Sequence, residues 1–179
     1  MQTLVIHPTD ASTDFLSLIY EHINCTLIRG NCTKNELFEM VNEHDRIIML
    51  GHGSPGGLFA VGQFINEGRL SYIIDESFVK LLRRKENNVY IWCYANRFVE
   101  KYGLKGFYTG MFISENAEAL MYGIDPQEEE VNRSNKLFSS IAGEIIETKA
   151  KNIYSHVKSK YKLPGSTVRD FNYERLYWR

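Results

Sequence analysis

Two residues of this sequence have side chains suited to nucleophilic catalysis. His52 follows an apolar run at 47–50, and Cys93 follows a second apolar run at 89–92. A cysteine acts as a nucleophile in its thiolate form, and a neighbouring imidazole can take up the thiol proton or stabilise the thiolate charge. The two residues therefore predict a His–Cys catalytic dyad, provided that the fold brings the ends of the two runs together.

The residues next to the pair fit the same chemistry. Gly53 has no side chain to obstruct a substrate, and its N–H and that of Cys93 could together form an oxyanion hole. If residues 95–100 begin a helix, the positive end of the helix dipole lowers the pKa of the Cys93 thiol further. Taken singly, each residue has a simpler explanation: a histidine in a hydrogen-bonded loop, and a cysteine buried as a small apolar side chain.

Apolar runs that alternate with helical patterns must position these residues. Five runs have the composition of β-strands, at 4–6, 26–28, 47–50, 89–92 and 107–113. Helices are expected at 14–22, after Thr33 with Glu36 in a capping box, at 77–85, at 115–122, and after Asp125 with Pro126 in the first turn. The glycine-rich segment 51–68 predicts a loop with a short hairpin near 58–64.

This alternation predicts an α/β fold, with a mostly parallel central sheet that is covered by helices on both faces. The right-handed crossover rule favours the strand order 2-1-3-4-5. In that order the third and fourth runs are neighbours, about 4.8 Å apart. Functional groups gather at the carboxyl ends of such strands, so His52 and Cys93 are expected side by side at one edge of the sheet.

The two motifs resemble those of the caspase-like clan of cysteine peptidases. Residues 47–54, IIMLGHGS, are similar to the apolar strand and His-Gly signature of caspases, metacaspases, gingipains, legumains, separases and the CHAT domains of bacterial proteins. Residues 88–93, NVYIWC, resemble the following strand and its nucleophile. The resemblance covers residues 4–113. It implies a caspase- or hemoglobinase-like fold, with Cys93 as nucleophile, His52 as general base or acid and Gly53 as an oxyanion donor.

The sequence also departs from the clan at the nucleophile. The clan usually has a small residue before the cysteine, whereas this chain has Trp92, and Tyr94-Ala95 replace the glycine-bearing runs that are common after it. These differences indicate either a narrower pocket or a domain that has kept the fold without the activity. The segment from Cys93 to Phe107 has no room for the cleavable linker of executioner caspases.

Asp10 is the candidate for substrate binding, because the clan often builds its primary pocket partly from the loop after the first strand. Its carboxylate could pair with an arginine or lysine side chain of a substrate. The alternative, which we favour, is that Asp10 caps the helix that follows.

Composition limits the other possibilities. We expect one caspase-like domain at 1–162 and an aromatic tail at 163–179 that packs on the domain or on a partner protein.

A net charge of -1 gives no reason to expect nucleic acid or an anionic membrane as a partner. No apolar run reaches the ~20 residues that cross a bilayer. Three cysteines without C-x-x-C spacing and a start unlike a signal peptide predict a cytoplasmic protein with free thiols. The histidines lack metal-ligand spacing, so neither a metal nor another cofactor is expected.

Three functions follow from these observations. The first is a cysteine endopeptidase that hydrolyses a peptide or protein substrate through His52 and Cys93. The second is a catalytically silent caspase-like domain that acts as a protein-interaction module, which Trp92 and the aromatic tail favour. The third is a flavodoxin-like ligand binder that uses the glycine-rich segment at 51–57, although this segment matches neither common phosphate-binding pattern.

Overall fold

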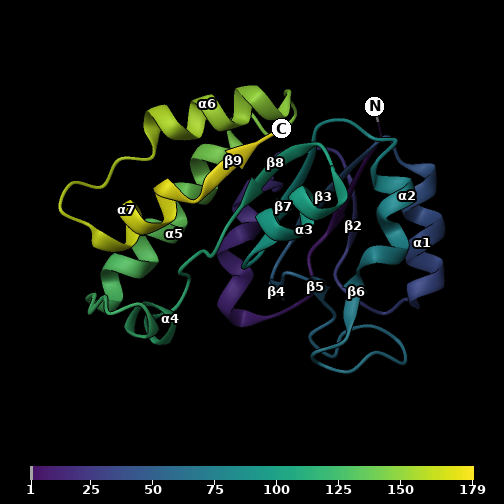
Figure 1. The fold of residues 1–179 in the computed structure, drawn as a ribbon, viewed down its shortest axis with the longest axis horizontal. Helices are drawn as coiled ribbons and strands as arrows, with labels where there is room; N and C mark the ends of the chain where they lie inside the picture. Colours follow the sequence, from purple (N-terminus) through teal and green to yellow (C-terminus); the bar gives the residue numbers. More distant parts are fainter. Residues whose placement is uncertain (1) are drawn as a thin grey trace.

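The computed structural model describes residues 2–179 and shows an α/β fold (Figure 1). Its main sheet has six strands in the order β2-β1-β3-β7-β8-β9. The first five are parallel, and β9 is antiparallel to β8. The predicted order 2-1-3-4-5 is confirmed, and β9 is an additional edge strand. The six strands are β1 (Thr3–Ile6), β2 (Thr26–Ile28), β3 (Arg46–Leu50), β7 (Asn88–Ile91), β8 (Gly106–Thr109) and β9 (Leu176–Trp178).

Helices cover both faces of this sheet. They are η1 (Ala11–Ile19), α1 (Lys34–Glu43), η2 (Glu76–Phe78), α2 (Val79–Leu82), α3 (Ala95–Tyr102), α4 (Asn116–Met121), α5 (Glu128–Gly143), α6 (Ala150–Lys160) and α7 (Thr167–Glu174), where η1 and η2 are 3-10 helices. Among residues 2–179 there is no helix with the length and apolar character needed to span a membrane.

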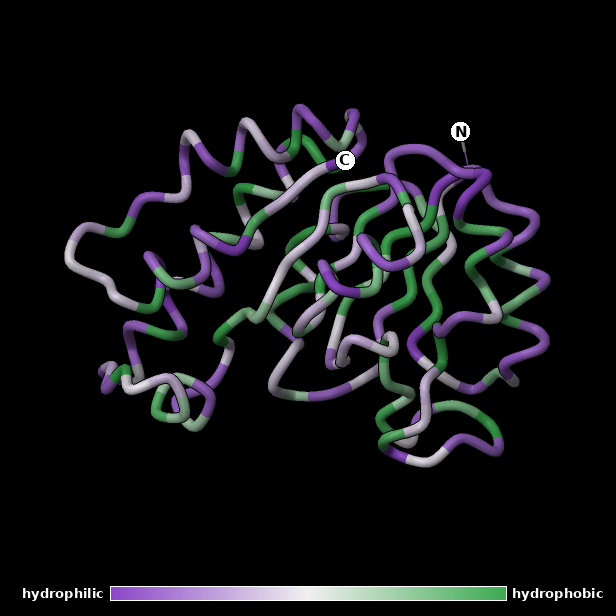
Figure 2. The backbone as a smooth tube through the Cα atoms, viewed as in Figure 1, coloured by the Kyte–Doolittle hydropathy of each residue, from purple (hydrophilic) through white to green (hydrophobic). Residues whose placement is uncertain are grey.

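The alternation of side chains along each strand separates two hydrophobic cores. Every residue of β1 and β3 is buried, as expected for strands that are covered on both faces. In β3, Ile47 and Met49 pack with side chains of α1, α2 and α3, whereas Ile48 and Leu50 pack with those of η1, α5 and α6. Figure 2 shows the resulting hydrophobic band along the central strands.

A second, smaller sheet follows β3 and begins one residue after His52. It consists of β4 (Gly53–Ser54), β5 (Gly57–Phe59) and β6 (Tyr72–Ile74), all antiparallel. The hairpin predicted at 58–64 therefore lies several residues earlier. The reason is the turn at Pro55-Gly56, since these residue types are strong turn formers and fix where the chain reverses.

Two helix starts also differ from the prediction. The first helix begins at Ala11 instead of near Asp14, because the Asp10 side chain accepts a hydrogen bond from the Ser12 N–H and caps it. The long helix α5 begins after Gln127 instead of after Asp125, since the backbone of Gln127 is still extended, with ψ 143°.

The C-terminal residues complete the edge of the main sheet. In β9, Leu176 pairs with Thr109 and is buried, and Trp178 pairs with Phe107. The Arg179 N–H donates to the carbonyl oxygen of Gly106 at 3.0 Å. Apolar residues of the tail thus pack on the domain through a strand that the sequence pattern did not predict.

A substitution at Gly57 can test how closely the strands of the small sheet pack. The φ of Gly57 is +145°, and a Cβ atom there would lie 1.9 Å from the carbonyl oxygen of Ile74. Gly57→Ala should therefore lower the free energy of unfolding by about 2 kcal/mol or more, measured by denaturant titration. Gly68→Ala is the matched control, because a Cβ atom there meets only the Ser71 hydroxyl at 3.5 Å. Equal stability of the two variants would contradict the close packing of β5 on β6.

Candidate active site

His52 and Cys93 lie at the carboxyl ends of two neighbouring parallel strands. Leu50 of β3 is in register with Ile91 of β7, so each candidate residue follows its registered partner by two positions. The Gly51 N–H donates to the Ile91 carbonyl at 3.0 Å and extends the pairing toward the site. The predicted adjacency of the two strands is confirmed. Both residues line one small cavity of about 20 Å³, which has room for about one water molecule.

The sulfur of Cys93 does not contact the imidazole in this structure. Its polar neighbours are the Phe112 carbonyl oxygen at 3.6 Å and Glu118 Oε1 at 3.8 Å. The residue as a whole is only partly buried, but burial of the sulfur and the Glu118 carboxylate raise the pKa of the Cys93 thiol to about 12. The expectation of a lowered pKa is therefore wrong: helix α3 does begin at Ala95, but burial and a nearby negative charge outweigh its dipole.

A strained turn presents Cys93 at the edge of the sheet. Tyr94 has φ 65° and ψ 26°, a left-handed conformation that costs about 1–2 kcal/mol in a residue other than glycine. Its N–H donates to Gly110, and its hydroxyl contacts the hydroxyl of Tyr122, just after α4. Surrounding contacts thus hold the chain in a reversal directly after the candidate nucleophile.

Trp92 packs away from Cys93, on the opposite face of the sheet. Trp92 is 1% exposed, and its Nε1–H donates to the Ser54 carbonyl at 3.0 Å. A Cβ atom at Gly53 would lie 2.3 Å from Trp92 Cδ1, so the glycine allows this ring to pack beneath it. The Trp92 side chain therefore packs in the hydrophobic core. The role of the Gly53 N–H as an oxyanion donor stays a prediction.

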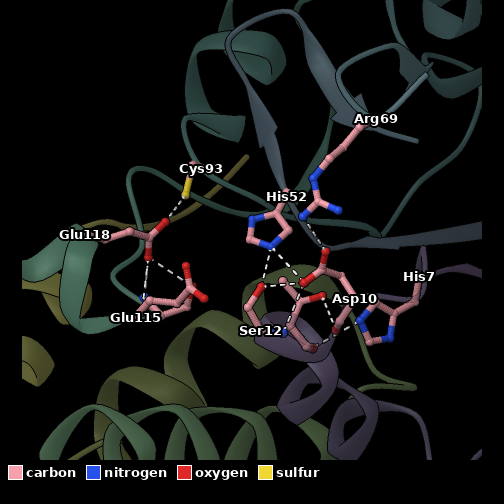
Figure 3. A network of polar contacts seen from close by, with 10 residues as sticks. His7, Asp10, Ser12, His52, Arg69, Cys93, Glu115 and Glu118 are labelled. Carbon is pink, nitrogen blue, oxygen red and sulfur yellow. Dashed lines mark hydrogen bonds and ion pairs between the residues drawn. The ribbon is translucent and has the colours of Figure 1, made fainter. Parts of the chain in front are cut away.

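The imidazole of His52 is held on its other side by Ser12 of η1 and by Asp10, which caps this helix. Its Nε2 lies 2.6 Å from the hydroxyl of Ser12 and 3.6 Å from Asp10 Oδ1. Figure 3 shows the ring between these two residues and the Cys93–Glu118 pair, with its second nitrogen on the side of Cys93. Sequence reasoning missed Ser12, although its position two residues after a capping aspartate is a common place for a hydroxyl that bonds the cap.

Asp10 serves as the helix cap, the alternative favoured from sequence. Its Oδ1 accepts from the Ser12 N–H at 3.1 Å and from the Ser12 hydroxyl at 2.7 Å, and its Oδ2 accepts from Arg69 at 3.0 Å. These bonds with Ser12, and the nearby charges of His52 and Arg69, lower the pKa of the Asp10 carboxyl, although burial opposes them. Arg69 thus occupies the position that a basic substrate side chain would take. Binding of such a side chain by Asp10 stays a prediction.

A larger cavity of about 660 Å³ adjoins the imidazole. Leu70, which is 75% exposed, stands at its wall together with Arg69. The cavity combines charged and apolar lining, which is typical of a site that binds part of a larger ligand. It is lined by Asp10, Ala11, Ser12, His52, Phe59, Val61, Arg69, Leu70 and Glu115.

A second histidine supports the first turn of η1, which carries Ser12. His7 is fully buried, and its Nε2 lies 3.1 Å from the Thr13 carbonyl while its Nδ1 lies 2.9 Å from the Tyr20 hydroxyl. Because a carbonyl only accepts, Nε2 donates and Nδ1 accepts from Tyr20. Burial, with a smaller contribution from Arg29, lowers the pKa of His7 to about 4. His7 therefore stays neutral and fixes the start of η1.

Comparison with protein-family models, with curated proteins and with solved structures gives no match for this chain. Among residues 2–179, no three or more His, Cys, Asp or Glu side chains are grouped so that they could hold a metal ion. The chemistry of the site is therefore argued from the arrangement of His52, Cys93 and their neighbours.

The contact between Glu118 and Cys93 predicts a measurable change in thiol reactivity. Glu118→Gln removes the charge but keeps an oxygen that can accept from the backbone of residues 114 and 115. A pKa decrease of about one unit would raise the thiolate fraction tenfold, partly offset by lower nucleophilicity. Iodoacetamide should therefore modify Cys93 several-fold faster in the variant, measured by mass spectrometry at pH 8. Cys25 in the same sample is the internal control, and an unchanged Cys93 rate would contradict this electrostatic effect.

His7 predicts a loss of stability in acid. The unfolded chain binds a proton at this residue near pH 6.5, whereas the folded protein does so only near pH 4. The unfolded state therefore takes up more protons in this interval, and stability should fall by up to ~3 kcal/mol as the pH decreases from 6.5 to 4.

The variant His7→Gln should flatten this dependence, measured as the free energy of unfolding at a series of pH values. His22→Gln is the control, since the His22 side chain is 81% exposed. If the free energy of unfolding of His7→Gln decreases between pH 6.5 and 4 as much as that of the parent, groups other than His7 cause the loss of stability.

Proposed function

We propose that this protein is a caspase-like cysteine peptidase in which Cys93 attacks a peptide carbonyl and His52 transfers the protons. The observation that carries the proposal is the register of β3 with β7, which places the two residues side by side on a shared cavity. The 660 Å³ cavity on the other side of His52 provides room for substrate residues.

The reaction follows the chemistry of a thiol nucleophile and an imidazole base. His52 accepts the Cys93 proton, and the sulfur forms a bond to the substrate carbonyl carbon. The N–H groups of Gly53 and Cys93 stabilise the resulting oxyanion. When the intermediate collapses, the C–N bond breaks and the leaving amine takes the proton from the imidazolium. Water, deprotonated by His52, then hydrolyses the thioester and restores the thiol.

Under this proposal, the observed arrangement of Cys93 corresponds to a resting form of the enzyme. The Cys93 sulfur faces Glu118 of α4 and the Phe112 carbonyl, and its raised pKa keeps it protonated near neutral pH. Catalysis requires rotation of the Cys93 side chain toward His52 and removal of the Glu118 charge from the sulfur. A short displacement of α4 would accomplish the second step, since this helix has only six residues and exposes Leu120 and Met121.

A catalytically silent interaction module is the second candidate. The contacts that keep the Cys93 thiol protonated also favour the silent module, because a buried thiol beside a carboxylate is a poor nucleophile. The tail, which was expected to pack on the domain or on a partner, pairs with β8 and leaves Trp178 42% exposed at the edge of the sheet. The ligand-binding alternative lacks such support, since Gly53 and Gly57 make room for Trp92 and for the backbone at Ile74.

Removal of the nucleophile and of the base distinguishes these candidates. Cys93→Ala should abolish both peptide cleavage and capture by a thiol-directed peptide probe. His52→Ala should lower the rate about 10²–10⁴-fold, the usual contribution of a general base. The double variant should resemble the worse single variant, because base and nucleophile act as a unit.

Cys25→Ala is the matched control and should cleave like the parent, since Cys25 lies away from this edge of the sheet, next to β2. The assay uses a panel of peptides with acidic, basic and apolar residues before the scissile bond. Cleavage by His52→Ala at the parental rate would exclude the dyad. If neither the parent nor the Glu118→Gln variant cleaves any peptide or reacts with the thiol-directed probe, the protein is a silent module.

A further inference from the structure

A chain of hydrogen bonds leads from Asp10 through Ser12 to the outer nitrogen of His52. The Ser12 hydroxyl lies 2.7 Å from Asp10 Oδ1 and 2.6 Å from His52 Nε2 (Figure 3). A hydroxyl has one proton and two lone pairs, so it can donate to only one of these partners. The direction of the two bonds therefore depends on which partner is unable to donate.

The carboxylate settles this direction. Asp10 also accepts from Arg69 and from the Ser12 N–H, and an ionised carboxylate is an acceptor only. The Ser12 proton must therefore point to Asp10, and the Ser12 oxygen is left to accept from His52. His52 consequently donates from Nε2, and its Nδ1 is the unprotonated nitrogen of the neutral ring. This nitrogen is the one on the side of Cys93 (Figure 3).

We infer that Ser12, held by Asp10, is a positioning residue that fixes the His52 tautomer with Nδ1 free to accept the proton of Cys93. The catalytic part of this inference rests on the proposed function, whereas the tautomer itself does not. When His52 becomes an imidazolium, both ring nitrogens donate, and the Ser12 oxygen continues to accept from Nε2. The same hydrogen bond therefore orients the base before and after proton transfer.

The remaining partners of Asp10 prevent the two hydrogen bonds of the Ser12 hydroxyl from reversing their direction. Arg69 Nη2 lies 3.0 Å from Oδ2, and the side chain of Asp10 is only 13% exposed. The bonds with Ser12 and the charge of Arg69 favour the ionised carboxylate over the opposing effect of partial burial, so Asp10 cannot donate to Ser12. The geometry thus assigns three residues of different types to one task, with Arg69 acting on Asp10, Asp10 on Ser12, and Ser12 on the imidazole.

Nuclear magnetic resonance of protein labelled with ¹⁵N in its histidines tests the tautomer directly. In the parent at pH 8, the His52 signals should show a protonated Nε2 and an unprotonated Nδ1. Ser12→Ala should produce a mixture of the two tautomers, and Ser12→Thr, which restores a hydroxyl, should return the parental form. Ser17→Ala is the matched control on the same helix, because the Ser17 hydroxyl bonds only the Asp14 carbonyl. His52→Gln identifies the His52 signals.

A parent with the proton on Nδ1 would overturn the inference, as would an unchanged tautomer in Ser12→Ala. The peptidase assay is a separate readout. There, Ser12→Ala should lower kcat about tenfold with little change in KM, and Ser12→Thr should recover most of it. An unchanged kcat in Ser12→Ala would exclude an effect of Ser12 on catalysis through His52. Absence of cleavage in the parent, with the expected tautomer present, would contradict the proposed function alone.

Discussion

The parallel pairing of β3 with β7 is the constraint on which the candidate site depends. Leu50 and Ile91 lie opposite each other, and the Gly51 N–H extends the ladder by one bond. A shift of the register by one residue would turn every side chain of one strand to the opposite face. The two separate cores, with Ile48 and Leu50 in one and Ile47 and Met49 in the other, prevent such a shift. Packing energy thus fixes the positions of His52 and Cys93.

Two carboxylates act in opposite ways on the two halves of the site. Asp10 lies beside His52, where its ionised carboxylate organises Ser12 and forms an ion pair with Arg69. Glu118 lies beside Cys93, where its negative charge and the burial of the sulfur favour the protonated thiol. In the proposed peptidase, this difference would orient the imidazole as a base while the thiol stays protonated until Glu118 of α4 moves away from the sulfur.

The glycines and the strained residue near the site are explained by close packing around it. Gly53 lies against the ring of Trp92, and Gly57 lies against the backbone of Ile74. Tyr94 adopts a left-handed conformation that returns the chain into α3 directly after Cys93. Strain of this kind persists only where the surroundings over-determine the backbone, as the contacts of Tyr94 with Gly110 and Tyr122 do here.

The sequence by itself determined the α/β class, the order of the first five strands and the adjacency of His52 and Cys93, because these depend on apolar runs and on topological rules that are local or general. It indicated the cap at Asp10 from residue type alone. Only the tertiary structure decided that β9 closes the sheet edge and that Trp92 points into the core. It also decided that Ser12 meets His52, that Glu118 meets Cys93, and that Arg69 pairs with Asp10. The contact between Asp10 and Arg69 joins residues 59 positions apart, and the burial that sets the pKa of Cys93 arises only when distant segments pack together.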